Sequence, residues 1–275
     1  MSFKIALIQM QVVEDTETNI RHAHELALEA SRNDADLIVL PEIFTCIYNA
    51  KNFPVHAFER GSLAYRKISE IAVATGSYLV AGSVPERDGD AVYNTSFTFS
   101  PDGTELCRHR KVHLFDIDVE GGQRFMESET LTAGRDLTIF ETPFAKVGVL
   151  ICYDIRFPEF SRLLVEQGAE LIVMPAAFNM TTGPAHWELS LRARALDNQV
   201  FYCACAPARN PESSYVSYAN SMVTTPWGEV LARAGIEEEI LYAEIDPEYE
   251  KKVRRELPLL KHRRLDLYTL SRAGE

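Results

Sequence analysis

The sequence contains no hydrophobic run long enough to cross a membrane. Its longest uninterrupted apolar runs are four to seven residues, as at 147–153, whereas a spanning helix needs about 20. Basic residues are also scarce, because 28 Lys and Arg stand against 40 Asp and Glu for a net charge of −12. A protein that binds nucleic acids or anionic membranes normally presents a basic face. We therefore expect neither a nucleic-acid partner nor a membrane partner.

Cysteine pairs, metal motifs and nucleotide motifs are absent too. The five cysteines show no C-x-x-C spacing, and the first residues do not read as a secretory signal. Free thiols of this kind favour a reducing, cytoplasmic compartment. The seven histidines are dispersed, and neither G-x-G-x-x-G nor G-x-x-x-x-G-K-[ST] occurs. We expect no metal ion and no cofactor.

The remaining composition is typical of a globular protein. Of the 275 residues, 46% are hydrophobic and 25% are charged, and a chain of this length can bury a large core. No Gly/Ser-rich linker or low-complexity tract interrupts it, so we expect a single domain over residues 1–275. Short β-branched runs alternate with helical patterns, which predicts an α/β fold.

Capping residues and apolar runs place the expected elements. Ser62 and Gly76 should flank one helix, and Pro158 suits the first turn of another. Strands are expected at 4–9, 37–40, 78–84, 92–100, 105–113 and 137–141.

Two stretches of the chain resemble each other. Residues 34–41 (DADLIVLP) match 168–175 (GAELIVMP), and residues 4–9 resemble 146–151. This predicts two similar half-structures, with two sheets packed face to face. The alternative is that any two buried strand–helix–strand units look alike.

Three reactive side chains occur at the ends of expected strands, where α/β proteins collect their active sites. They are Glu42, Lys111 and Cys152. Each also has an ordinary explanation: a solvated turn glutamate, an edge-strand lysine, or a cysteine buried as a small apolar residue. Together, however, a thiol, a carboxylate and an amine can divide acyl transfer into nucleophile, base and charge stabiliser.

The residues around these three side chains resemble a known family. LPE at 40–42, HRKVHL at 109–114 and LICYDIRFPE at 150–159 are similar to the three catalytic motifs of the nitrilase superfamily of carbon–nitrogen hydrolases. The resemblance covers nearly the whole chain. It implies an α-β-β-α sandwich and a homodimer or a larger even-numbered assembly.

The resemblance also implies a mechanism with a Cys-Glu-Lys triad. Glu42 would take the proton of the Cys152 thiol, which attacks an amide carbonyl to form a thioester. The Lys111 ammonium and the backbone N–H of Tyr153 would stabilise the oxyanion. Glu127 stands where many members carry a second glutamate, which would orient Lys111 and the hydrolytic water.

Within the superfamily, the segments at 113–119, 178–188 and 197–199 resemble the omega-amidase branch. That branch hydrolyses the terminal amide of α-ketoglutaramate and α-ketosuccinamate, so a small-molecule amide is the expected partner. Deaminated-glutathione amidases share the stretch at 181–188 and stay as the alternative.

A substrate that carries a carboxylate needs a cation beyond the triad. Arg156 is the first choice, although a salt bridge to Asp154 or Glu159 would explain it equally well. Phe178 and Thr182 follow an expected strand and should line the same site, and a third residue, Tyr48, should reach it from the loop after the catalytic glutamate.

Three other functions fit parts of the pattern. A Cys-His hydrolase would use His113 or His186 as its base. A binding module would keep the fold without catalysis, and a nitrile hydrolase would keep the same three catalytic residues.

Overall fold

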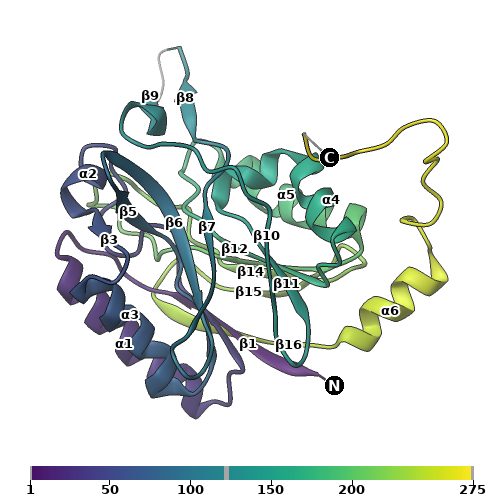
Figure 1. Cartoon of the computed structure of the whole chain (residues 1–275), viewed down its shortest axis with the longest axis horizontal. Helices are drawn as coiled ribbons and strands as arrows, with labels where there is room; N and C mark the ends of the chain where they lie inside the picture. The colour runs from purple at the N-terminus through teal and green to yellow at the C-terminus, as the bar shows by residue number, and fades with distance from the viewer. Residues whose placement is uncertain (1, 121–123, 274–275) are drawn as a thin grey trace.

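The computed structural model describes residues 2–120 and 124–273 and contains two large sheets (Figure 1). The first has the order β16 (Glu239–Ile245), β1 (Phe3–Gln9), β2 (Leu37–Val39), β4 (Tyr78–Val80), β6 (Ala91–Phe99), β5 (Val84–Asp88), β3 (Phe58–Glu59), with β7 (Glu105–Arg110) also paired to β6. The second has the order β10 (Thr138–Glu141), β11 (Lys146–Val149), β12 (Leu171–Pro175), β13 (Phe201–Cys205), β14 (Met222–Thr224), β15 (Val230–Arg233). A separate hairpin pairs β8 (Asp116–Asp118) with β9 (Arg124–Met126).

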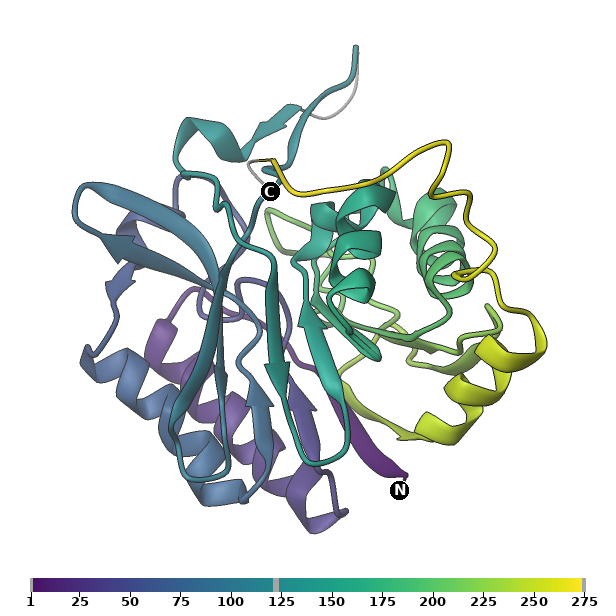
Figure 2. The same ribbon diagram turned by 45° about the vertical axis from the view of Figure 1, so that its right-hand side comes forward.

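Helices cover the outer face of each sheet. The helices α1 (Thr16–Arg32) and α3 (Leu63–Thr75) lie on the first sheet, and α4 (Pro158–Glu166) and α5 (Gly183–Asn198) lie on the second (Figures 1 and 2). The shorter helical elements are α2 (Phe53–His56), α6 (Pro247–Glu256) and the 3₁₀ turns η1 (Glu127–Glu129) and η2 (Cys152–Arg156). Along the described ranges, no helix is both long enough and apolar enough to span a membrane.

Successive side chains of a strand point to opposite faces of its sheet, so each sheet packs against a core on both faces. In β1, Ile5 and Leu7 pack between the two sheets, while Ala6 and Ile8 pack under the helices. Because both faces are buried, the strand reads as a continuous apolar run. The predicted α-β-β-α sandwich is therefore confirmed, with one core between the sheets and one under each helical layer.

The predicted helix ends are confirmed. The Ser62 side chain accepts a hydrogen bond from Tyr65 N at the start of α3, and Gly76 ends that helix in the left-handed conformation. Pro158 is the first residue of α4. The repeated halves also correspond, because β1 pairs with β2 and β11 pairs with β12, both in parallel.

Two strand predictions were wrong, and both errors lie next to reactive residues. The expected strand at 78–84 is divided into β4 and β5, because Gly82 takes a left-handed backbone with φ of +50°. The expected strand at 105–113 ends at Arg110. Beyond it, the Lys111 carbonyl accepts a hydrogen bond from Gly134 N instead of from a neighbouring strand. Lys111 therefore lies just outside the sheet.

Gly82 supports the turn that carries Glu42, which generates a prediction. A Cβ atom at Gly82 would lie 2.1 Å from the Pro41 carbonyl oxygen, so Gly82→Ala should force that segment to move. The matched control is Gly61→Ala, where φ is also left-handed but no atom lies within 4 Å of the added Cβ. The control should lose about 1–2 kcal/mol of unfolding free energy from conformation alone. Urea unfolding should give a clearly larger loss for Gly82→Ala, and equal losses would contradict the clash.

Candidate active site

The three strand ends converge on one buried ion cluster. Glu42 follows β2, Lys111 follows β7, and Cys152 follows β11 as the first residue of η2. Lys111 Nζ lies 2.9 Å from Glu42 Oε1 and 2.9 Å from Glu127 Oε2. All four side chains are buried. The sequence-predicted residues Glu42, Lys111, Glu127 and Cys152 are thus neighbours in space.

Cys152 adopts an uncommon backbone conformation. Its φ of +45° lies in the left-handed region, which costs a residue with a side chain about 1–2 kcal/mol. Such strain persists only where the surroundings enforce it, and it is concentrated at functional sites. The turn presents the thiol to the Glu42 carboxylate.

Further polar groups hold the two glutamates in place. Asn94 Nδ2 donates to Glu42 Oε1 at 2.8 Å. The Tyr48 hydroxyl donates to Glu127 Oε1 at 2.6 Å, and Phe115 N donates to Glu127 Oε2 at 2.6 Å. Glu42 Oε1 therefore accepts hydrogen bonds from both Lys111 and Asn94. In contrast, Glu42 Oε2 is buried with no hydrogen-bond partner among the described residues.

The electrostatics favour a neutral thiol next to a carboxylate of raised basicity. Burial raises the pKa of Glu42, and Glu127 adds to this, whereas Lys111 opposes it. Burial and the charge of Glu42 also raise the pKa of the Cys152 thiol well above its usual value. Burial opposes the charge on Lys111, but Glu127 and Glu42 hold its pKa above the normal range. Cys152 therefore rests as a thiol beside a carboxylate able to accept its proton, and Lys111 stays cationic.

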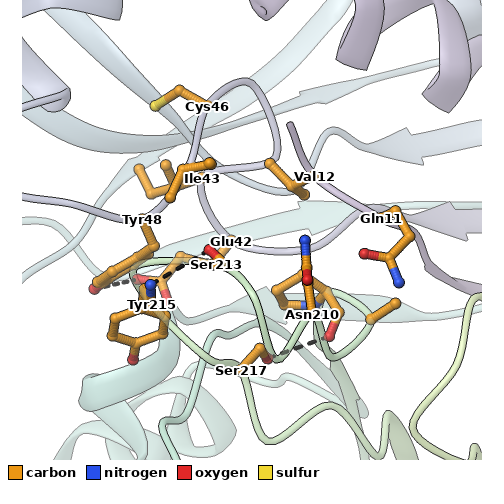
Figure 3. A pocket seen from close by; sticks show the side chains of 13 residues that line it. Gln11, Val12, Glu42, Ile43, Cys46, Tyr48, Asn210, Ser213, Tyr215 and Ser217 are labelled. Carbon is orange, nitrogen blue, oxygen red and sulfur yellow. Dashed lines mark hydrogen bonds between the residues drawn. The ribbon is translucent and has the colours of Figure 1, made fainter. Parts of the chain in front are cut away.

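Two small cavities flank this cluster. One, of about 10 Å³, adjoins Cys152, and its lining includes Phe115, Tyr153, Arg156, Phe178 and Thr182. The other, of about 30 Å³, adjoins Glu42, and its lining includes Gln11, Tyr48, Asn210, Tyr215 and Ser217 (Figure 3). Tyr215 lines both cavities.

The structure brings most of the expected substrate contacts to Cys152. Arg156, Phe178 and Thr182 share its cavity. Thr182 also donates its hydroxyl to Asn179 Oδ1 at 3.0 Å. Tyr48 lies on the other side of the cluster, with its hydroxyl committed to Glu127. This places Tyr48 as a support for Glu127.

Arg156 forms no ion pair with Asp154 or Glu159 in the part of the chain that the structure describes. Its guanidinium contacts His186 Nδ1 at 3.0 Å and lies 5.0 Å from the centre of the Phe178 ring. A guanidinium can only donate hydrogen bonds, so His186 Nδ1 accepts. The positive charge of Arg156 in the Cys152 cavity is left without a carboxylate.

The two histidines considered as alternative bases have other partners. His113 Nδ1 lies 2.8 Å from Asp154 Oδ1, and its ring stacks on Phe157 with centroids 3.7 Å apart. His186 Nδ1 contacts Arg156. Both contacts favour Glu42 as the base. Across residues 2–120 and 124–273, no group of three or more His, Cys, Asp or Glu could hold a metal ion.

Sequence reasoning missed Asn94 and Tyr215. Asn94 lies in β6, where buried polar residues interrupt an otherwise apolar sheet, and that unusual run was the available signal. Tyr215 lies in an irregular segment after β13 and packs on Tyr48, with ring centroids 4.6 Å apart. No local pattern marks it.

Comparison with known proteins gives matches over most of the chain. Residues 4–255 match a family model described as carbon-nitrogen hydrolase. Omega-amidase NIT2 of Xenopus tropicalis is 48% identical over 268 residues, 98% of this chain and 97% of that protein. Omega-amidase NIT2 of Homo sapiens is 45% identical over 269 residues, 98% of each. The crystal structure of Saccharomyces cerevisiae Nit3, a member of branch 10 of the nitrilase superfamily, has a TM-score of 0.89 and 41% identity, covering 96% of this chain and 97% of that one.

The raised pKa of Cys152 gives a prediction for the unliganded protein. The ultraviolet absorbance of its thiolate, measured as the difference between wild type and Cys152→Ser, should be absent at neutral pH. It should appear only in alkaline solution, because burial and Glu42 both oppose ionisation. A thiolate signal that reaches a plateau in mildly acidic solution would contradict this. Such a plateau is the signature of a thiolate–imidazolium pair and would favour a histidine partner.

Proposed function

We propose that this chain, which belongs to the carbon–nitrogen hydrolase family, is an omega-amidase acting on 2-oxo acid monoamides such as α-ketoglutaramate and α-ketosuccinamate. The match over residues 4–255 establishes the family and confirms the resemblance to the nitrilase superfamily. With relatives 45–48% identical over almost the full chain, the protein is an amidase of that superfamily. One observation supports the choice of substrate: a nucleophile shares one cavity with a guanidinium that has no carboxylate partner among the described residues.

In the proposed acylation step, the Cys152 sulfur attacks the amide carbonyl carbon while its proton passes to Glu42. The carbonyl oxygen becomes an oxyanion, stabilised by the Lys111 ammonium and the Tyr153 backbone N–H. When the tetrahedral intermediate collapses, the C–N bond breaks and Glu42 returns the proton to the leaving nitrogen. Ammonia departs and a thioester remains. The unpartnered Glu42 Oε2 and the raised pKa values of both partners support this exchange.

In the proposed deacylation step, water attacks the thioester and gives a proton to Glu42. The new C–O bond forms, the C–S bond breaks, and the proton passes from Glu42 to the sulfur, which restores the thiol and releases the acid. Glu127 never needs to transfer a proton in this scheme. Its two oxygens bind Lys111, Tyr48 and the Phe115 amide, so its role is to hold the ammonium in position.

We assign recognition of the substrate's carboxylate to Arg156. Its contacts with the Phe178 and Tyr153 rings and with His186 orient the guanidinium without neutralising it. A guanidinium binds a carboxylate through two parallel hydrogen bonds. A deaminated-glutathione amidase would use the same catalytic cluster with a longer substrate. It stays the alternative, because the residues at 181–188 fit both.

We also propose that two copies of the chain associate through their helical faces. The α5 face exposes Leu189 and Leu196 beside Trp227, and exposed apolar groups in one patch are typical of an interface. All five cysteines are free thiols, which fits the predicted cytoplasmic compartment.

Substituting Arg156→Gln should raise KM for α-ketoglutaramate by about 10–100-fold, because a hydrogen bond between charged groups contributes roughly 1.5–3 kcal/mol. Hydrolysis of a neutral linear amide should change little. The matched control is Arg66→Gln, which removes one exposed cation from α3. KM and kcat of the wild type and of both variants are measured from steady-state ammonia release. Equal losses for the charged and the neutral amide would contradict a carboxylate-binding role.

The substrate itself should be tested by ammonia release from α-ketoglutaramate, deaminated glutathione, glutamine and a simple nitrile in parallel. The account predicts preference for α-ketoglutaramate. Preference for deaminated glutathione or for the nitrile would replace the substrate assignment and keep the chemistry. Release from none of the four would overturn the proposed activity and favour a binding function.

A further inference from the structure

We propose that Asp154 is a positioning residue that fixes the Cys152 nucleophile relative to Lys111, with His109 and His113 as its partners. The proposal rests on the proposed function in one respect, since it takes Cys152 and Lys111 to be the reacting groups. The contacts that carry it are separate from the ion cluster and involve residues to which the acyl-transfer scheme gives no role.

Asp154 lies two residues after Cys152 in η2 and is fully buried. Both of its carboxylate oxygens are used. Oδ1 accepts from His113 N at 2.9 Å and from His113 Nδ1 at 2.8 Å. Oδ2 accepts from Ile151 N at 3.0 Å and from His109 Nε2 at 3.3 Å. One side chain therefore receives four hydrogen bonds.

These partners flank Lys111 on both sides and directly precede Cys152. His109 and His113 are each two residues from Lys111, and Ile151 directly precedes Cys152. Asp154 also donates its backbone N–H to the Ile151 carbonyl at 3.1 Å. The carboxylate thus closes the left-handed turn at Cys152 and ties it to the segment that carries Lys111. Side-chain hydrogen bonds, in addition to the sheets, link these two segments.

The histidines are themselves held in position. His109 is fully buried, and its Nδ1 lies 3.0 Å from Thr138 Oγ1. Because its Nε2 donates to Asp154, we assign Nδ1 as the acceptor of the Thr138 hydroxyl. The His113 ring stacks on Phe157. Both rings therefore present fixed donors to the carboxylate.

The charge of Asp154 is maintained by these same contacts. Burial would raise the pKa of Asp154, but the hydrogen bonds from His109 and His113, together with the Ile151 amide, hold it well below the usual range. A buried carboxylate that stays ionised is a strong and directional acceptor. This is suited to fixing a strained turn, because displacement of Cys152 would break several charge-assisted hydrogen bonds at once.

The expected consequence of losing this contact is a defect in the chemical step. The thiol must meet the substrate carbonyl while Lys111 and the Tyr153 amide meet its oxygen, and a displacement of about 1 Å can cost roughly 100-fold in rate. The Arg156 guanidinium is held by His186 and the Phe178 ring and not by Asp154, so substrate binding should be retained.

The test uses Asp154→Asn and, as a second variant, His113→Phe, which keeps a ring against Phe157 but removes the Nδ1 donor. In each, kcat for the amide should fall about 100-fold with KM changed little. Alkylation of Cys152 by iodoacetamide should also slow. The double variant should lose no more than the worse single variant, because residues that act as one unit are not additive.

The matched control is Asp15→Asn, since Asp15 also accepts a backbone N–H with its carboxylate, at the start of α1. That variant should keep kcat and the alkylation rate, because asparagine caps a helix about as well as aspartate does. If Asp154→Asn and His113→Phe behave like Asp15→Asn, the positioning role is overturned, and a rise in KM alone overturns it too. Should Asp154→Asn fail to fold, His113→Phe still decides. The alkylation rate also tests the contact if no amide proves to be a substrate, which separates this proposal from the proposed function.

Discussion

The structure depends on a lysine ammonium that is held, without access to water, between two carboxylates. Burying three ionised groups costs several kcal/mol per ion after relaxation, and only close pairing offsets it. Lys111 reaches both Glu42 and Glu127 at 2.9 Å, and neutral donors hydrogen-bond to Glu42 Oε1 and to both oxygens of Glu127. Removing the Lys111 charge would leave two buried carboxylates uncompensated. In the proposed mechanism the cluster supplies the chemistry, and its burial is maintained at the expense of stability.

The two-sheet architecture supplies the rigidity that this cluster needs. Glu42 follows the second strand of the parallel pair β1–β2 in the first sheet, and Cys152 follows the first strand of the parallel pair β11–β12 in the second sheet. The shared core between the sheets fixes their separation. Lys111 comes from a strand that leaves the first sheet one residue earlier, and hydrogen bonds from Gly134 and to Asn94 fix its backbone. The proposed reacting groups therefore lie at the ends of rigid elements, where small errors of position are least.

Much of this arrangement could be predicted from the sequence, because apolar runs and the residues that end them are local signals. The strand before Glu42, the turn at Cys152 and the helix at Pro158 were all marked in this way. The supporting groups were not, since Asn94, Tyr215 and Asp154 act through contacts with residues far away in the chain. The same limit explains why the expected strand at 105–113 is longer than β7. Just beyond Arg110, the Lys111 carbonyl accepts a hydrogen bond from the distant Gly134, and no strand-breaking residue marks this point in the local sequence.

The most direct test of the central claim is the partition of the acyl group between water and hydroxylamine. A linear monoamide without a 2-oxo group, which hydroxylamine cannot convert to an oxime, and the corresponding methyl ester should give the same ratio of hydroxamate to acid at each hydroxylamine concentration, since both would form the same thioester on Cys152. The ratio should rise with hydroxylamine, and Cys152→Ala should form neither product. Release of acid without hydroxamate, ratios that depend on the leaving group, or turnover by Cys152→Ala would contradict the account.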